Sequence, residues 1–347
     1  AYYHQLIKEL YDYIESPEEI EEKAMSWLNA ELPRLWDTTK ELAIIYGIEP
    51  NIDTMDNEIG IRSVVGKSEL MAFIKNLREK AKEVMESRLV RVNPKYKTKV
   101  LKTPDYLVNF IPTAAMTMFD SLTEQPFNIF FVTTDEKRSP PTSVPDIFQL
   151  VIHEEYGHCV NFSNSAVGFE YKPTLVERLN SHLHYPISEG ISFHREYESL
   201  ELLEELVAKP EENLSFEEKE FLDALTSKTD IKTVFLESEF TLLKWRIIRF
   251  LRAIGDVRIN MNKQSLTEFV EWAAKKTGFT EKVIYDQLFV FQENPGYAPC
   301  YSIAGMALKE IQDEARKKGK DILEFNTITS SLGFPPRTVF EERLRNL

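Results

Sequence analysis

Apolar residues recur at intervals of three and four positions over the first 90 residues, with charged residues between them. The stretches "IEEKAMSWLNAELPRLWDTTKELAIIYG" and "KSELMAFIKNLREKAKEVMESRL" show this spacing, which places apolar side chains on one face of an α-helix. The same pattern returns at Ser188 and continues almost to the last residue. It predicts helices over residues 188–207, 215–226, 231–255, 265–276, 280–291, 301–318 and 336–346. The chain is therefore predicted to be mainly α.

Residues 98–134 have a different composition. "KTKVLKTPDYLVNFIP" and "FNIFFVTT" are rich in valine, isoleucine, phenylalanine and threonine, and prolines interrupt them. These residues favour strands, so we expect a small sheet or hairpin here. A helix should follow over "SVPDIFQLVIHEEYGHCVNFSN", with Ser143 as its N-cap and Pro145 in its first turn.

Length and charge narrow the range of partners. The chain has 347 residues, enough for one large domain or two smaller ones, and a formal net charge of −14. Nucleic acids and anionic membranes attract basic surfaces, and no apolar run is long enough to span a bilayer. We therefore expect neither partner, a cytoplasmic location, and reduced thiols at Cys159 and Cys300. Because the first residue is Ala1 rather than methionine, we expect a processed product or a piece of a longer protein.

The segment "VIHEEYGHCV" carries the most specific chemical signal. His153 and His158 are five residues apart, and in a regular α-helix that spacing separates two side chains by about 140°. One extra residue, accommodated as a π-bulge, would turn both imidazoles toward one ion, and such bulges are common at functional sites. Gly157 precedes His158, where a distorted backbone costs least. We expect the helix to depart from α geometry between Tyr156 and His158; the alternative is a helix with two incidental histidines.

A glutamate next to the first histidine is the usual general base of a zinc hydrolase. Glu154 occupies that position. Glu155 points about 100° away around the helix, so Glu155→Gln is expected to change little.

Catalytic zinc takes three protein ligands and leaves one position open for water. Glu189, 31 residues after His158, is the expected third ligand. Glu196 lies seven residues further, on the same helical face, and is expected to orient one of the histidines. His182 and His184 in "HLHY" are alternatives, either as ligands or as groups that stabilise an oxyanion.

Three segments occur in the order "FNIFFVTTDEKRSPPTSVPDIFQLVIHEEYGHCVNF", "SEGISFHREYE" and "NPGYAPCYSIAGMALKEIQDEARKKGKDILEFNTITSSLGFPPRTVFEERL". Together they resemble the domain of unknown function 885 family, zinc-peptidase-like proteins related to the gluzincins and similar to helical carboxypeptidases and oligopeptidases. The family carries H-E-x-x-P-G-H, then E-G-W-A-x-Y-x-E, then P-G-Q-A-x-S-Y-K. The matching residues are His153, Glu154, Gly157 and His158, then Glu189, Gly190 and Glu196, then Pro295, Gly296 and Tyr301.

The chain also departs from the family pattern. The proline before Gly157 is missing, Ile191 replaces a tryptophan, and Ser302 replaces a lysine that could hold a substrate carboxylate. Family members are generally longer, with the extra length before the histidine motif.

The resemblance implies a gluzincin-like helical metallopeptidase fold with a small sheet beside the active-site helix. Residues 98–347 would form the catalytic domain, and residues 1–97 a helical region that could belong to a longer lobe. The implied activity is hydrolysis of peptide or amide bonds, in short peptides, with one Zn²⁺ per chain. Its ligands would be His153, His158 and Glu189.

The remaining site residues follow from the third motif and from charge spacing. Tyr301 is the expected donor to the oxyanion, followed by Tyr297 and His184. Arg249 and Arg252 are expected to bind a substrate carboxylate, with Tyr297 beside the substrate. An extended peptide could pair with "FNIFFVTT" as an edge strand. A non-peptidase metal hydrolase, or a degenerate family member that only binds, remains an alternative, and the oligomeric state stays open.

Overall fold

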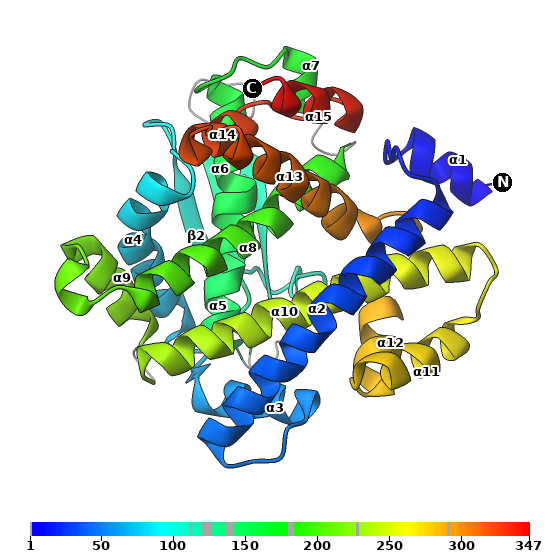
Figure 1. The fold of residues 1–347 in the computed structure, drawn as a ribbon. Coiled ribbons are helices and arrows are strands. Elements are labelled where there is room, and N and C mark those ends of the chain that lie inside the picture. The colour runs from blue at the N-terminus through cyan, green and yellow to red at the C-terminus, as the bar shows by residue number, and fades with distance from the viewer. Residues whose placement is uncertain are drawn as a thin grey trace.

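The computed structural model describes residues 2–111, 113–119, 127–135, 142–179, 184–226, 229–289 and 292–347, and it is mainly helical (Figure 1). The helices before residue 180 are α1 (Tyr2–Glu9), α2 (Pro17–Tyr46), α3 (Ile52–Arg62), α4 (Leu70–Arg88), α5 (Val144–Val151), α6 (Val160–Val167) and α7 (Leu175–Leu179). Those after it are α8 (Tyr185–Ala208), α9 (Phe216–Leu225), α10 (Ile231–Asn260), α11 (Leu266–Thr277), α12 (Glu281–Phe289), α13 (Pro299–Lys317), α14 (Ile322–Thr329) and α15 (Arg337–Arg345). A π-helical segment, η1 (Ile152–Cys159), joins α5 to α6, and a 3₁₀ turn, η3 (Glu211–Asn213), precedes α9.

The seven helices expected after Ser188 are all present, with ends shifted by a few residues. Two short helices, α7 and α14, were not expected. α14 has only eight residues, about two turns, and half of its sequence "ILEFNTIT" is β-branched. No described helix is long and apolar enough to cross a membrane.

The expected sheet has three strands, in the order β2 (Thr98–Lys102), β4 (Phe127–Val132) and β3 (Ala114–Phe119). β2 is parallel to β4, and β3 is antiparallel to it, with Met116 opposite Phe130. The expectation that "FNIFFVTT" forms an edge strand is wrong, because β4 is hydrogen-bonded on both sides. The described edges of this sheet are β2 and β3.

The core is built around α10, which is buried along most of its length although it carries charged residues such as Arg246 and Arg249. α2 runs alongside α10, and α13 runs along α8 (Figure 1). Leu28 and Leu35 of α2 belong to the same hydrophobic cluster as Phe240 and Ile247 of α10. The N-terminal helices thus share a core with the C-terminal ones, and the division at residue 97 stays a prediction.

One continuous rod of α5, η1 and α6 carries the histidine segment. It begins as expected: Ser143 is the N-cap, its hydroxyl accepts from the backbone N–H of Asp146, and Pro145 lies in the first turn. A short antiparallel pair of β1 (Val64–Val65) and β5 (Thr142–Ser143) anchors this start. The expected departure from α geometry is confirmed, because the backbone is π-helical from Ile152 to Cys159.

Gly157 is required for a reason other than the one expected from the sequence. A Cβ atom built at Gly157 would lie 2.4–2.6 Å from the Cα, Cβ and Oγ atoms of Ser192 on α8. The glycine therefore permits η1 and α8 to approach closely, and this approach brings the histidines of η1 next to Glu189 of α8.

We expect Gly157→Ala to lower the free energy of unfolding by about 1–3 kcal/mol, the usual cost of overpacking a close contact. Gly60, inside α3, is the matched control because a Cβ there meets nothing within 4 Å. Gly60→Ala should raise stability by up to about 1 kcal/mol. Urea unfolding of the two variants measures both effects. Equal midpoints for Gly157→Ala and the unmodified protein would contradict the packing argument.

Candidate metal centre

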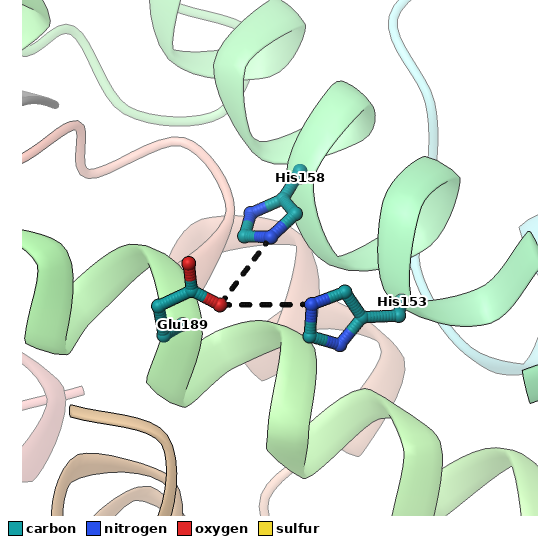
Figure 2. A group of neighbouring side chains, drawn as sticks. All are labelled: His153, His158 and Glu189. Atoms are coloured by element: carbon teal, nitrogen blue, oxygen red, sulfur yellow. Dashed lines mark ion pairs between the residues drawn. The ribbon is translucent and has the colours of Figure 1, made fainter. Parts of the chain in front are cut away.

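Two histidines and one glutamate point toward a common centre. His153 and His158 extend from η1, and Glu189 extends from α8 toward both rings (Figure 2). The Glu189 Oε2 atom lies 3.6 Å from Nε2 of His153 and 3.6 Å from Nε2 of His158. The π-helical turn makes this possible, because it returns side chains five residues apart to the same face.

The spacing of the three donors is that of a candidate metal site: two of the donor–donor distances are 3.6 Å, and all three atoms lie within 4.8 Å of one another. Atoms that share a tetrahedral zinc ion at 2.0–2.2 Å are themselves about 3.3–3.6 Å apart. Glu189 is 8% exposed, yet its Oε2 atom accepts no hydrogen bond within the described part of the chain. A buried carboxylate oxygen without a donor is costly unless a cation completes it. Among the described residues, these three form the only group of histidine, cysteine and acidic side chains with metal-binding spacing.

Glu196 holds His153 in position, as expected. Its Oε1 atom lies 2.7 Å from Nδ1 of His153, so Nε2 is left to face the centre. Arg249 holds Glu196 in turn through two hydrogen bonds, of 2.5 and 2.8 Å. Gln149, one turn before His153, donates a third at 3.1 Å. Glu196 is 1% exposed, so it is a buried and fully paired carboxylate rather than a surface glutamate.

The electrostatics of the centre favour bound positive charge. Burial lowers the pKa of His153, but the adjacent carboxylates of Glu189 and Glu196 outweigh it and raise that pKa to about 10. Burial likewise opposes ionisation of Glu196, while Arg249 and His153 lower its pKa to about 2. The pKa of Glu189 also falls well below its usual range, because the two histidines outweigh the effect of burial. The carboxylates are thus charged and the site attracts a cation, whether a proton or a metal ion.

Two serines that were not predicted from the sequence orient His158. Ser188 and Ser192, one turn apart on α8, place their hydroxyls 3.0 and 3.1 Å from Nδ1 of His158. Their spacing of four residues around Glu189 is the only local signal. It becomes meaningful only once η1 is known to pack on this face of α8.

Two tyrosines complete the surroundings of Glu189. Tyr297 donates a hydrogen bond of 2.8 Å to the Oε1 atom of Glu189 and lies 3.2 Å from the hydroxyl of Tyr301. The Tyr301 ring stacks on His153, with 6.3 Å between ring centroids. The expected position of Tyr301 at the centre is therefore found. Tyr297 contacts a candidate ligand, a placement that differs from the substrate contact expected.

Glu154 faces a cleft of about 670 Å³ together with His153, Tyr301 and Arg252. Within the described ranges it makes no hydrogen bond or ion pair, so its carboxylate is available to a molecule in the cleft. This is the environment expected of a general base.

Glu155 is not the inert neighbour that the helix geometry suggests. It is 5% exposed and forms a two-pronged ion pair with Arg78 of α4, and Tyr96 donates a further hydrogen bond at 3.1 Å. Removing one member of a buried ion pair leaves the other uncompensated. Glu155→Gln is therefore a poor control, because it should destabilise the fold.

The other expected site residues lie at different places. Both terminal nitrogens of Arg249 donate hydrogen bonds to Glu196. They are therefore not available for the two-pronged binding of a substrate carboxylate that was expected. Arg252 lines the cleft and contacts Gln287, and burial lowers its pKa to about 10. His184 occupies the N-cap position of α8 without a capping hydrogen bond from its side chain, and within the described part of the chain no hydrogen bond or ion pair joins it to the centre. His182 lies outside the described residues.

No model of a known protein family matches the chain, and no curated protein matches it in sequence. Two solved structures share the fold. A protein of Colwellia psychrerythraea, provisionally described as a lipoprotein, superimposes with a TM-score of 0.75 at 16% identity, over 99% of this chain and 54% of that one. A protein of Shewanella oneidensis, also provisionally described as a lipoprotein and of unknown function, gives 0.73 at 15% identity, over 99% and 59%. The chain spans somewhat more than half the length of these proteins, and the likeness concerns the fold alone.

Proposed function

We propose that this protein is a zinc-dependent hydrolase that cleaves peptide or amide bonds. The observation that carries the proposal is the unpartnered Oε2 atom of Glu189, equidistant from the Nε2 atoms of His153 and His158. The resemblance to the domain of unknown function 885 family, with its gluzincin-like fold, supports the same reading. Zinc in such a site activates water near neutral pH and polarises a carbonyl group.

Other residues of the chain would transfer the proton, stabilise the oxyanion and orient the ligands. Glu154 takes a proton from the attacking water and passes it to the leaving amine. Tyr301 donates a hydrogen bond to the developing oxyanion, and burial supports that role by raising the pKa of its phenol, which stays protonated. Glu196 and Arg249 keep His153 oriented, and Ser188 and Ser192 do the same for His158.

An extended peptide would reach the centre along β3 rather than β4. β3 is an edge strand that lies against η1, and Thr113 at its start lines the cleft with His153 and Glu154. An edge strand offers backbone hydrogen bonds to a peptide. The opposite wall supplies apolar contacts from Trp245, Ile248, Phe279 and Val283.

Arg252 remains our proposed contact for a substrate carboxylate, because it brings a buried positive charge to the cleft. His184 remains a second candidate for the oxyanion. A cytoplasmic location also stays a prediction, since the two proteins with the same fold are described as lipoproteins.

The proposal is tested by metal analysis and a peptide library. We expect about one zinc per chain in the purified protein, and hydrolysis that a chelator abolishes and added Zn²⁺ restores. Mass spectrometry of the digested library would report both cleavage and its position. Negligible metal, together with no effect of Zn²⁺ on activity or melting temperature, would overturn it.

A further inference from the structure

The hydroxyl of Tyr297 decides which oxygen of Glu189 faces the histidines. It donates to Oε1, at 2.8 Å, and leaves Oε2 facing both imidazoles. A partner of this kind fixes the orientation of a ligand and strengthens metal binding, typically by 10–100-fold. Tyr297 lies on the connection between α12 and α13, where its N–H donates to the carbonyl of Asn294 and its carbonyl accepts from the N–H of Cys300. The position of this turn depends on the residue before it.

The preceding residue, Gly296, is held at both of its backbone polar groups. Its N–H donates to the Oδ2 atom of Asp256, at 2.8 Å, and its carbonyl accepts from the hydroxyl of Tyr13, at 3.1 Å. Gly296 has φ +86°, and a Cβ atom there would lie 2.8 Å from the ring of Tyr11. The backbone at Gly296 therefore takes its left-handed conformation directly against the residues that follow α1.

Asp256 links this connection to α1. It lies in α10, is 2% exposed, and its Oδ2 atom also accepts from the hydroxyl of Tyr3, at 2.7 Å. Asn260 donates to its Oδ1 atom at 2.9 Å. A single carboxylate oxygen thus joins the first helix to the backbone next to Tyr297. Figure 1 shows α1 at the edge of the molecule, close to the start of α13.

The tyrosines that make these contacts are buried, which restricts their movement. Tyr3, Tyr11 and Tyr13 are each at most 6% exposed, and they pack in one cluster with Cys300 and, at its margin, Tyr297. The neighbouring Tyr2 is 75% exposed. The sequence "YY" at the start of the chain therefore contains one tyrosine that faces solvent and one that reaches the interior.

We propose that Tyr3 and Asp256 are positioning residues for the metal centre, and that residues 3–13 act as a clamp on the backbone that carries Tyr297. The line of contacts runs from Tyr3 to Asp256, then to Gly296, Tyr297 and Glu189. This inference rests on the proposed zinc site. It assigns to α1, which contacts none of the three ligands, an effect on metal affinity.

Two adjacent tyrosines provide the matched test. Tyr3→Phe removes only the hydroxyl that reaches Asp256, and Tyr2→Phe removes an exposed hydroxyl from the same helix. The dissociation constant for Zn²⁺, measured by competition with a chromophoric chelator, should rise about three- to tenfold in Tyr3→Phe and stay unchanged in Tyr2→Phe. Tyr297→Phe should raise it by about 10–100-fold.

A second pair of variants addresses Asp256. Asp256→Ala removes the acceptor for both Tyr3 and Gly296, whereas Asp256→Asn keeps an oxygen that can accept from both. Zinc affinity should fall further in Asp256→Ala than in Asp256→Asn. In the metal-free protein, hydrogen exchange of the peptide that contains Gly296 should accelerate in Asp256→Ala and Tyr3→Phe but not in Tyr2→Phe.

The outcomes separate this inference from the proposed function. If the unmodified protein binds zinc but Tyr3→Phe and Tyr2→Phe bind it equally well, the clamp is refuted and the proposed function stands. If Tyr3→Phe accelerates exchange near Gly296 without weakening zinc binding, the contact is structural only and the inference also fails. If the unmodified protein binds no zinc, the proposed function fails and takes the inference with it.

Discussion

Glu154→Gln is expected to lower kcat on any cleaved peptide by about 10²–10⁴-fold, the usual cost of losing a general base. Glutamine keeps the size of the side chain and can still hydrogen-bond water, but it cannot accept a proton. The loss should fall on kcat, because neither substrate binding nor metal binding requires the proton transfer. Zinc content should be unchanged, since Glu154 faces the cleft and is not among the three candidate ligands.

The control for this prediction must be a carboxylate in the same cleft but outside the centre. Asp286 of α12 lines the cleft and pairs only with Lys282, one turn away on the surface. Asp286→Asn should therefore retain turnover within a few-fold of that of the unmodified protein. Full activity in Glu154→Gln, or an equal loss in both variants, would remove Glu154 from the role of base.

His158→Ala is expected to abolish stable zinc binding. Loss of a group that merely orients a ligand costs 10–100-fold in affinity, so loss of a ligand itself should cost more, on the order of 10³-fold. Added Zn²⁺ at 100 times its dissociation constant should stabilise the unmodified protein by about 2.7 kcal/mol and leave His158→Ala unchanged. Elemental analysis and thermal unfolding with and without Zn²⁺ measure the two effects.

His4→Ala is a suitable control, because the His4 side chain is exposed on α1 and its only ion pair among the described residues is with Glu18, at 3.8 Å. It removes one histidine while leaving the centre intact, and it should bind zinc normally. Retention of one zinc per chain by His158→Ala would show that another set of residues holds the metal.

Local patterns in the sequence were sufficient for the elements and for the histidine segment. A helix that buries one face must repeat apolar residues every three or four positions, so the long helices are visible in the sequence. The same helical geometry prevents two histidines five residues apart from facing one ion in a regular α-helix. For that reason the π-helical turn at Tyr156–His158 could be predicted from His153, Gly157 and His158 alone.

Strand pairing was harder to predict from the sequence, because neighbouring strands in a sheet need not be neighbours in the chain. The composition of "FNIFFVTT" indicates a strand, but it does not say whether one or both sides are paired. β4 proved to be central because β2 and β3, from earlier in the chain, both pair with it. The edge strand proposed to pair with a peptide is therefore β3 and not β4.

The sequence by itself determined a mainly helical protein and a π-helical turn, and it singled out two histidines and a glutamate as proposed ligands of one metal ion. Only the tertiary structure decided what holds these groups. Arg249 donates to Glu196, Arg78 donates to Glu155, and Tyr297 donates to Glu189. These partners are 53, 77 and 108 residues apart in the sequence. The physical reason is that helical periodicity acts within a few residues and leaves a trace in the sequence. Contacts between distant segments depend on how whole helices pack, and no local pattern records that.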